Sequence, residues 1–219
     1  MHRPSIVVSG LSIAAVAGFA LVGLNAPAEA TNASTTERIS SAKQVFNIDA
    51  GHSGVIFKIR HDAHSNFYGR FDAVRGEFHW DGDTPTNSSV ELQIPIESVN
   101  TGNEKRDDHL KSADFFNGRQ YPNASFSSTG MRSTGEDNTW ELMGDLTMHG
   151  VTRPITAELS MISAGEGPRG GVEAGFEATF SIKRSDFGIT SYLADDGGEG
   201  GGLGNTVEIT VFVEGHLQD

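Results

Sequence analysis

Hydrophobic and polar residues alternate along most of the chain after residue 44. Apolar residues recur at every second position in the ranges 55–59, 90–96, 172–182 and 207–213, and mostly polar residues separate them. A period of two places one face of a β-strand against a core and the other face in solvent. The pattern therefore predicts an all-β domain whose strands are each buried on one side.

Short polar segments separate the predicted strands. A His-Gly pair at 149–150 joins the strand 142–148 to the strand 151–162 with almost no spare residues, and Asp-Gly-Asp at 81–83 follows another strand. Such short connections join neighbouring antiparallel strands. About eight strands joined in this way favour an antiparallel β-barrel, in which closure removes the exposed edges. A two-sheet sandwich is the alternative, because alternation alone does not distinguish the two.

One segment has a helical composition. The range Glu104–Lys111 is charged and lies in a long connection. We expect a short helix there, with Leu110, Phe115 and Phe116 packing it against the domain, and we hypothesise that it covers one mouth of the barrel. The glycine-rich range 195–204 is expected to be a mobile surface loop.

The first 30 residues differ from the rest of the chain. A basic start precedes an apolar run over 6–24, and the small-x-small sequence 28–30 (Ala-Glu-Ala) follows it. These features predict a signal peptide that is cleaved near Ala30, with an uncleaved membrane anchor as the alternative. We expect residues 31–43 to be a flexible leader and residues 44–217 to be the barrel domain. Export to the periplasm, the cell surface or the medium is the corresponding expectation for location.

Charge and the lack of cysteine exclude several classes of function. The formal net charge is −13, with 29 Asp and Glu against 16 Lys and Arg. An acidic surface repels phosphate backbones and anionic lipid headgroups, so we expect no nucleic-acid partner and no membrane docking by charge alone. The sequence contains no cysteine, which rules out disulfides, thiolate metal sites and cysteine nucleophiles.

The range Arg106–His109 (Arg-Asp-Asp-His) is the strongest candidate for catalysis, because carboxylates beside an imidazole suit acid–base chemistry. Adjacent residues on a helix do not face one another, so these groups do not converge. We favour a structural role, in which acidic side chains lie near the helix start and Arg106 pairs with a loop carboxylate. A metal- or His/Asp-dependent enzyme at this range remains the alternative.

Six of the eight histidines are candidate metal ligands: His52, His61, His64, His79, His109 and His149. No His-Glu-x-x-His sequence occurs, and the segment from His61 to His64 is typical of a turn. We interpret His52 and His61 as hydrogen-bonding partners of strand ends. Serine-hydrolase and phosphate-loop motifs are also missing. The sequence therefore predicts no catalytic residue, no metal and no cofactor.

Several short motifs follow one another along the range 46–214. They are Phe46-Asn47-Ile48-Asp49, His52-Ser53 with Phe57 and His61 in phase, Gly69-Arg70-Phe71, Glu97-Ser98-Val99-Asn100-Thr101-Gly102, Arg106-Asp107-Asp108-His109-Leu110-Lys111-Ser112, Asp114-Phe115-Phe116, Tyr121-Pro122, the run from Gly144 to Pro154, and Arg184-Ser185-Asp186-Phe187-Gly188-Ile189. Each motif is weak alone, but the ordered set is specific. It resembles the YceI-like family of polyisoprenoid-binding proteins. The glycine-rich insert Gly197–Gly204 departs from the family pattern and affects the expected rim geometry and headgroup selectivity.

The resemblance implies a lipocalin-like barrel that is exported and that binds a long polyisoprenoid or a similar amphiphilic lipid, with a quinone among the candidates. The implied role is that of a carrier, storage or stress-related protein without catalysis. A membrane redox partner and a homodimer are left open. An interaction module for such a redox partner is a further alternative, which the polar outward faces of the strands disfavour.

The apolar strand faces are the candidate ligand-binding surface. The sequence does not distinguish a packed core from a lined cavity, and the resemblance favours the cavity. The candidate lining residues are Val55, Phe57, Ile59, Phe71, Leu92, Ile94, Phe126, Leu142, Leu146, Phe176, Phe180, Val207, Ile209 and Val211. At the rim, Asn100, Arg106 and Arg184 are candidate headgroup contacts. An ion pair between Arg184 and Asp186 is an equal alternative.

Overall fold

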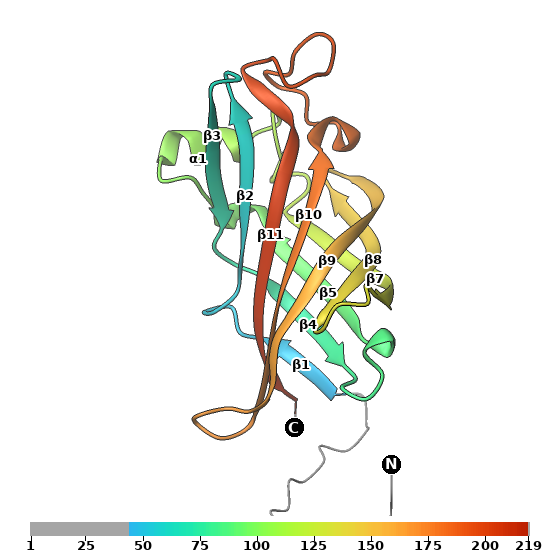
Figure 1. The fold of residues 1–219 in the computed structure, drawn as a ribbon. Helices are drawn as coiled ribbons and strands as arrows, with labels where there is room; N and C mark the ends of the chain where they lie inside the picture. Colours follow the sequence, from blue (N-terminus) through green and yellow to red (C-terminus); the bar gives the residue numbers. More distant parts are fainter. Residues whose placement is uncertain (1–43, 219) are drawn as a thin grey trace, which may run out of the picture. The chain divides into compact units, whose positions relative to one another are not determined.

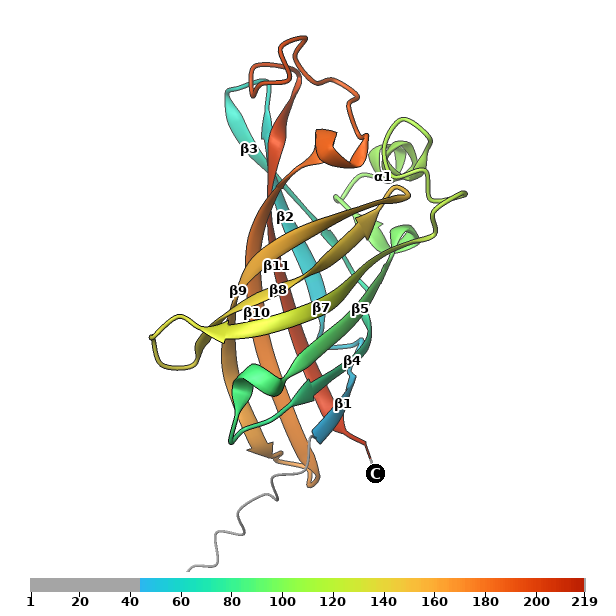
Figure 2. The same ribbon diagram turned by 90° about the vertical axis from the view of Figure 1, so that its right-hand side faces the viewer.

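The structure is a computed structural model that describes residues 44–218. The predicted signal peptide and leader lie outside the described residues. Within them, eleven strands pair antiparallel in a single sheet (Figures 1 and 2). The elements are β1 (Gln44–Ile48), β2 (Gly54–His61), β3 (Ser65–Phe71), β4 (Arg75–Trp80), η1 (Pro85–Asn87), β5 (Ser89–Pro95), η2 (Ile96–Ser98), β6 (Val99–Asn100), α1 (Glu104–Lys111), β7 (Asn123–Ser133), β8 (Thr139–Met148), β9 (Val151–Glu166), β10 (Val172–Lys183), η3 (Arg184–Phe187) and β11 (Leu203–Leu217).

Eight of these strands form a closed ring. The order is β1-β4-β5-β7-β8-β9-β10-β11, and pairing of β1 with β11 closes it, for example at Phe46 opposite Leu217. Closure leaves these strands without a free edge, which is the physical advantage of a barrel over an open sheet. The predicted antiparallel barrel of about eight strands is therefore confirmed, and the sandwich alternative is not the fold.

The long strand β11 gives the barrel two different cross-sections. Its residues 215–217 pair with β1, whereas its residues 203–212 pair with the whole of β2. The hairpin of β2 and β3 therefore replaces β1 in the wall at one end, and Arg70 and Phe71 of β3 pair with the short strand β6. In Figure 2 this is the end where α1 lies. The wall there contains β2 and β3 in place of β1, and the mouth of the barrel forms at this end.

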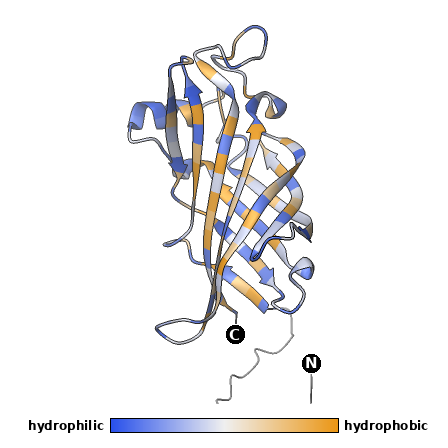
Figure 3. Cartoon of the chain, viewed as in Figure 1, coloured by the Kyte–Doolittle hydropathy of each residue, from blue (hydrophilic) through white to orange (hydrophobic). Residues whose placement is uncertain are grey.

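The predicted alternation is seen in the burial of the strands. In β10, Ala174, Phe176 and Ala178 are buried whereas Glu177 between them is exposed. The corresponding alternation of apolar and polar positions runs along the neighbouring strands in Figure 3. Burial of one face stabilises each strand in proportion to the apolar area removed from water.

Aromatic rings fill the interior at the end of the barrel where β1 lies. The ring of Phe78 stacks on Phe46 at 5.0 Å between centroids and meets Phe176 edge-on at 5.2 Å. All three side chains are at most 1 % exposed. Offset and edge-to-face contacts of this kind are favourable for aromatic pairs. This end is a packed core.

The hairpin between β8 and β9 turns on two residues with positive φ. The φ angles are 53° at His149 and 75° at Gly150, as a two-residue type I′ turn requires. A side-chain hydrogen bond also holds the turn in place, because His149 Nδ1 lies 2.9 Å from the carbonyl oxygen of Phe187 in η3. The short connection inferred from the sequence is therefore present.

Helix α1 spans Glu104–Lys111, as the sequence predicted. Its N-cap is Asn103, whose side chain accepts a hydrogen bond from the backbone N–H of Arg106 at 3.1 Å. The segment after the helix inserts Phe115, which is 6 % exposed, and the partly buried Phe116 into the barrel. Within residues 44–218, none of the helices has the length and hydrophobicity that crossing a membrane requires.

Candidate functional site

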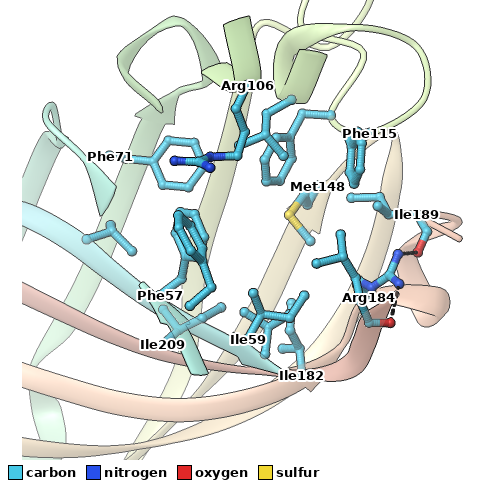
Figure 4. A pocket seen from close by; sticks show the side chains of 16 residues that line it. Phe57, Ile59, Phe71, Arg106, Phe115, Met148, Ile182, Arg184, Ile189 and Ile209 are labelled. Atoms are coloured by element: carbon cyan, nitrogen blue, oxygen red, sulfur yellow. Dashed lines mark hydrogen bonds between the residues drawn. The ribbon is translucent and has the colours of Figure 1, made fainter. Parts of the chain in front are cut away.

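The candidate site is an apolar cavity inside the barrel at the end where α1 lies (Figure 4). Its volume is about 140 Å³. Two of its lining residues are charged, Arg106 and Arg184, and the others are apolar. The lining residues are Val55, Phe57, Ile59, Phe67, Phe71, Arg106, Leu110, Phe115, Phe116, Met148, Ile182, Arg184, Ile189, Leu203, Val207 and Ile209.

Six of the fourteen predicted lining residues meet around this cavity: Val55, Phe57, Ile59, Phe71, Val207 and Ile209. They come from β2, β3 and β11, the strands that build the wall at this end. The other eight lie outside the cavity, in the core or packed against it: Leu92, Ile94, Phe126, Leu142, Leu146, Phe176, Phe180 and Val211. A strand pattern reports that a face is apolar but not how far the interior is filled, so the predicted lining extends further along the barrel than the cavity does.

Sequence reasoning missed eight apolar lining residues: Phe67, Leu110, Phe115, Phe116, Met148, Ile182, Ile189 and Leu203. Three of these, Leu110, Phe115 and Phe116, were expected to pack the helix against the domain. The signal was therefore available: side chains that pin a helix over a barrel mouth also form the roof of the space below it. Of the remaining five, Ile182 belongs to the alternating range 172–182 and Phe67 lies within β3, so their strand faces were available as a signal. Met148 and Leu203 lie at strand ends and Ile189 lies in a loop, where a period of two carries no information.

A shallow depression continues from the cavity to the surface. It has a volume of about 520 Å³ and shares Phe67, Arg106, Leu110, Phe115 and Leu203 with the cavity. Its outer part adds polar and aromatic side chains, namely His61, Asp62, Ser65, His109 and Tyr192. The site thus changes from apolar inside to mixed polar and aromatic outside, as an amphiphilic ligand requires.

Arg106 of α1 stands between the cavity and the depression. Its Nε donates to Thr101 Oγ1 at 2.7 Å and its Nη2 donates to the Thr101 carbonyl oxygen at 2.8 Å. Its guanidinium lies 4.5 Å from the ring centroid of Phe67, a cation–π geometry. The expected pairing of Arg106 with a loop carboxylate is wrong, because the guanidinium uses the threonine and the ring instead. Arg106 lines both the cavity and the depression, and its contact with a ligand headgroup stays a prediction.

Asn100 does not reach the cavity. Its side-chain amide donates to Asp72 Oδ2 at 2.7 Å, and its Oδ1 accepts from the backbone N–H of Gly102 at 3.0 Å. Both bonds hold the connection that leads from β6 into α1. The structure therefore gives Asn100 a positioning role in this connection rather than a place on the lining.

Arg184 of η3 is 4 % exposed and donates only to backbone carbonyls. Its Nε donates to Gly204 at 2.7 Å, its Nη1 to Ile189 at 3.1 Å and Ser191 at 2.9 Å, and its Nη2 to Leu203 at 3.0 Å. The alternative predicted from the sequence, an ion pair between Arg184 and Asp186, is therefore not formed. In Figure 4, Arg184 lies beside Ile189 on a different side of the cavity from Arg106.

The glycine-rich loop is tied to the same group of residues. Glu199 accepts hydrogen bonds from the backbone N–H groups of Asn205 at 3.0 Å and Thr206 at 2.8 Å, and from Thr206 Oγ1 at 2.7 Å. Burial alone would raise the pKa of Glu199, but these bonds and the charge of Arg184 lower it below its ordinary value. Burial also lowers the pKa of Arg184, which Glu199 partly opposes, and an arginine remains charged at neutral pH. Hydrogen bonds therefore fix the loop beside the mouth.

The groups of the proposed acid–base site do not converge. Asp107 accepts from the backbone N–H of Thr101 at 2.9 Å and from its hydroxyl at 2.5 Å, whereas His109 pairs with Asp114 at 3.0 Å. His61 and His109 border the same depression, but within residues 44–218 three or more metal-type ligands come together only elsewhere, around Asp49. The arrangement of these side chains at the mouth can hold and orient a ligand.

Comparison with known proteins places these observations in a family. Residues 46–215 match the family model described as a YceI-like domain. "Protein YceI" of Escherichia coli O17:K52:H18 is 40 % identical over 167 residues, which cover 76 % of this chain and 83 % of that protein.

Two solved structures share the fold. The crystal structure of Burkholderia cenocepacia BcnA has a TM-score of 0.66 at 20 % identity, covering 76 % of this chain and 98 % of that one. A structure described as a polyisoprenoid binding domain from Saccharophagus degradans, implicated in plant cell wall breakdown, has a TM-score of 0.58 at 18 % identity, covering 79 % and 98 %. At these identities the likeness concerns the fold.

Proposed function

Because this chain belongs to the YceI-like domain family, we propose that its barrel binds the apolar chain of a polyisoprenoid-type amphiphile, with a quinone among the candidate ligands. The observation that carries the proposal is the apolar cavity under α1, which opens into a depression with polar and aromatic edges. The name of the Saccharophagus degradans domain, a polyisoprenoid binding domain, supports the same ligand class. The proposed role is binding rather than catalysis.

The driving force for such binding is burial of hydrocarbon. Each buried methylene contributes about 0.8 kcal/mol, so one five-carbon prenyl unit contributes about 4 kcal/mol before the costs of ordering the ligand. Neither Phe57 nor Ile209 imposes directional bonding on such a chain. The wall therefore favours apolar chains as a class, and selectivity for a headgroup falls to the depression.

The size of the cavity sets a condition on this function. A cavity of about 150 Å³ holds a molecule the size of benzene, and the cavity here is about 140 Å³. It accommodates roughly one prenyl unit as it stands. Binding a longer chain therefore requires flexible lining side chains such as Met148 to move apart, because a thioether side chain adapts to irregular space.

The direct test is mass spectrometry of organic extracts from the protein, purified from its native host without detergent. A stoichiometric prenyl lipid or quinone supports the proposal and identifies the ligand. An extract that contains no such lipid, together with no binding of added prenyl alcohols, contradicts it. The intact mass of the same preparation tests export, since cleavage near Ala30 is expected in the mature protein.

A pair of variants on β11 localises the ligand. Ile209→Trp fills the cavity and is expected to reduce the affinity for a prenyl alcohol such as farnesol by tenfold or more. Glu208→Trp adds the same side chain on the outer face of the same strand, where Glu208 is exposed and pairs with Lys58 at 2.5 Å. Equal affinities of the two variants would show that the ligand does not occupy the cavity.

A further inference from the structure

A cluster of ionisable side chains lies at the other end of the barrel. Asp49 and His52 belong to the turn between β1 and β2, and Glu214 and His216 lie near the C-terminal end of β11. In Figure 1 this is the end at which β1 and the C-terminus lie, away from α1. The cluster therefore shares no lining residue with the lipid cavity.

The donor atoms of this cluster converge. One ligand atom from each of Asp49, His52 and Glu214 lies within 4.8 Å of the others. His52 Nδ1 is 2.7 Å from Asp49 Oδ2 and 3.8 Å from Glu214 Oε1. His216 Nε2 approaches the same Asp49 oxygen at 3.4 Å. Three side chains from two distant parts of the sequence thus converge, and His216 lies beside one of them, Asp49.

Backbone hydrogen bonds hold the two halves of the cluster together. The N–H of Asp49 donates to the carbonyl oxygen of Glu214 at 2.9 Å, and the N–H of Glu214 donates to Ser53 Oγ at 3.0 Å. Ser53 is 5 % exposed and its hydroxyl also donates to the Glu214 carbonyl at 3.3 Å. The cluster is therefore built on main chain that is already fixed, which lowers the cost of assembling a ligand set.

The charge balance of the cluster favours a cation. Within the described residues, the ion pairs of Asp49, Glu214 and Glu173 are all made with histidines: His52 faces the first two, and His216 Nδ1 lies 3.6 Å from Glu173. The Gly51 N–H donates to Asp49 Oδ1 at 2.8 Å, which leaves Asp49 Oδ2 facing the two imidazoles. Three carboxylates thus face two imidazoles.

We propose that Asp49, His52 and Glu214 bind a divalent transition-metal ion of the zinc type, with His216 able to supply a fourth ligand. Two imidazoles with carboxylates suit Zn²⁺, whereas Ca²⁺ and Mg²⁺ prefer sets of oxygen ligands. Tetrahedral bonds of about 2.1 Å separate neighbouring donors by roughly 3.4 Å. The donors of Asp49, His52 and Glu214 lie within 4.8 Å of one another, and His52 Nδ1 is 2.7 and 3.8 Å from the two carboxylates, so small side-chain movements bring the three donors to this spacing.

This proposal departs from the sequence-based expectation of no metal. That expectation rested on the spacing of histidines, and the two histidines here are 164 positions apart and are brought together by the pairing of β1 with β11. The bound ion would join the β1–β2 turn to the last strand, next to the pairing that closes the ring. It would therefore stabilise the barrel at its closure.

Calorimetric titration of Zn²⁺ into chelator-treated full-length protein without a histidine tag tests the site. We expect one equivalent to bind, and Asp49→Asn and Glu214→Gln each to reduce the affinity by about tenfold or more. His64→Ala is the matched control, since His64 is an exposed histidine of the β2–β3 turn outside the cluster, and it is expected to bind as the unaltered protein does. The melting temperature should rise with Zn²⁺ in the unaltered protein and in His64→Ala, and much less in the two cluster variants.

Nuclear magnetic resonance of the imidazole nitrogens gives a second readout. The signals of His52 and His216 are expected to shift on adding Zn²⁺, and that of His64 to stay unchanged. Absence of binding at millimolar Zn²⁺, or binding that both cluster variants retain at full affinity, would overturn the proposal. Circular dichroism of the metal-free variants confirms that a loss of binding does not come from unfolding.

Discussion

Replacing Arg184 by methionine tests whether this residue anchors the loops around the mouth. Methionine keeps an unbranched apolar stem of similar length but removes every donor. The bonds to Gly204 and Ile189 are buried, and those to Ser191 and Leu203 are partly buried. Arg184→Met therefore removes the donor of two buried carbonyl oxygens, those of Gly204 and Ile189.

The magnitude follows from these carbonyls. Each buried acceptor left unsatisfied costs about 1–3 kcal/mol, which gives about 2–6 kcal/mol for two. Removing a buried guanidinium also removes its desolvation cost, which offsets part of this loss. We expect a net loss of about 3 kcal/mol in the free energy of unfolding. With a urea m-value of about 2 kcal/mol/M, the unfolding midpoint would fall by about 1.5 M.

Urea unfolding followed by circular dichroism measures the global effect, and hydrogen exchange of the amides in 189–205 measures the local one. Arg184→Lys keeps the charge but has only a compact ammonium group as donor, so it should be only slightly more stable than Arg184→Met. A loss below about 1 kcal/mol would refute the reasoning, because it would mean that water satisfies the freed carbonyls. A lower lipid affinity at unchanged stability would instead support the headgroup role inferred from the sequence.

Two further predictions concern stability. A Cβ at Gly144 would lie 2.3 Å from the ring of Phe126 and 2.6 Å from the Ser127 carbonyl oxygen. Gly144→Ala should therefore lower the free energy of unfolding, measured by urea titration, by about 2 kcal/mol. Gly130→Ala is the control and should change this free energy little, because its Cβ would meet Met143 at 3.4 Å. The lowered pKa of Glu199 means that its stabilising contribution is present above the ordinary pKa and is lost as pH falls through the lower, folded value. Glu199→Gln should therefore lower the urea midpoint near neutral pH and have a much smaller effect in strong acid, and an equal effect at both pH values would argue against this account.

The sequence by itself determined the strands, their inward faces and the hairpins. Period-two alternation depends on neighbouring residues only, and so does the turn at His149 and Gly150, where two positive φ angles suit a short hairpin. Helix α1 was equally accessible, because a charged run in a long connection is a local signal. The ordered motifs also indicated the family, because they are distributed over most of the domain.

The extent of the cavity was decided by tertiary structure. Phe176 and Ile209 both lie on the inward faces of strands, yet Phe176 packs against Phe78 in a filled core and Ile209 borders an open space. The difference depends on which strands share a cross-section, and β11 changes its partner from β2 to β1 along its length. No local pattern contains that information.

Long-range contacts also decided what the polar residues do. The partners of Arg184 are carbonyl oxygens, which every residue possesses and which therefore leave no mark in a sequence. Asp49 and Glu214 become neighbours only because the first and last strands of the domain pair and close the ring. The sequence specifies the faces of the elements, and the closure of the barrel decides which of those faces enclose space and which distant side chains meet.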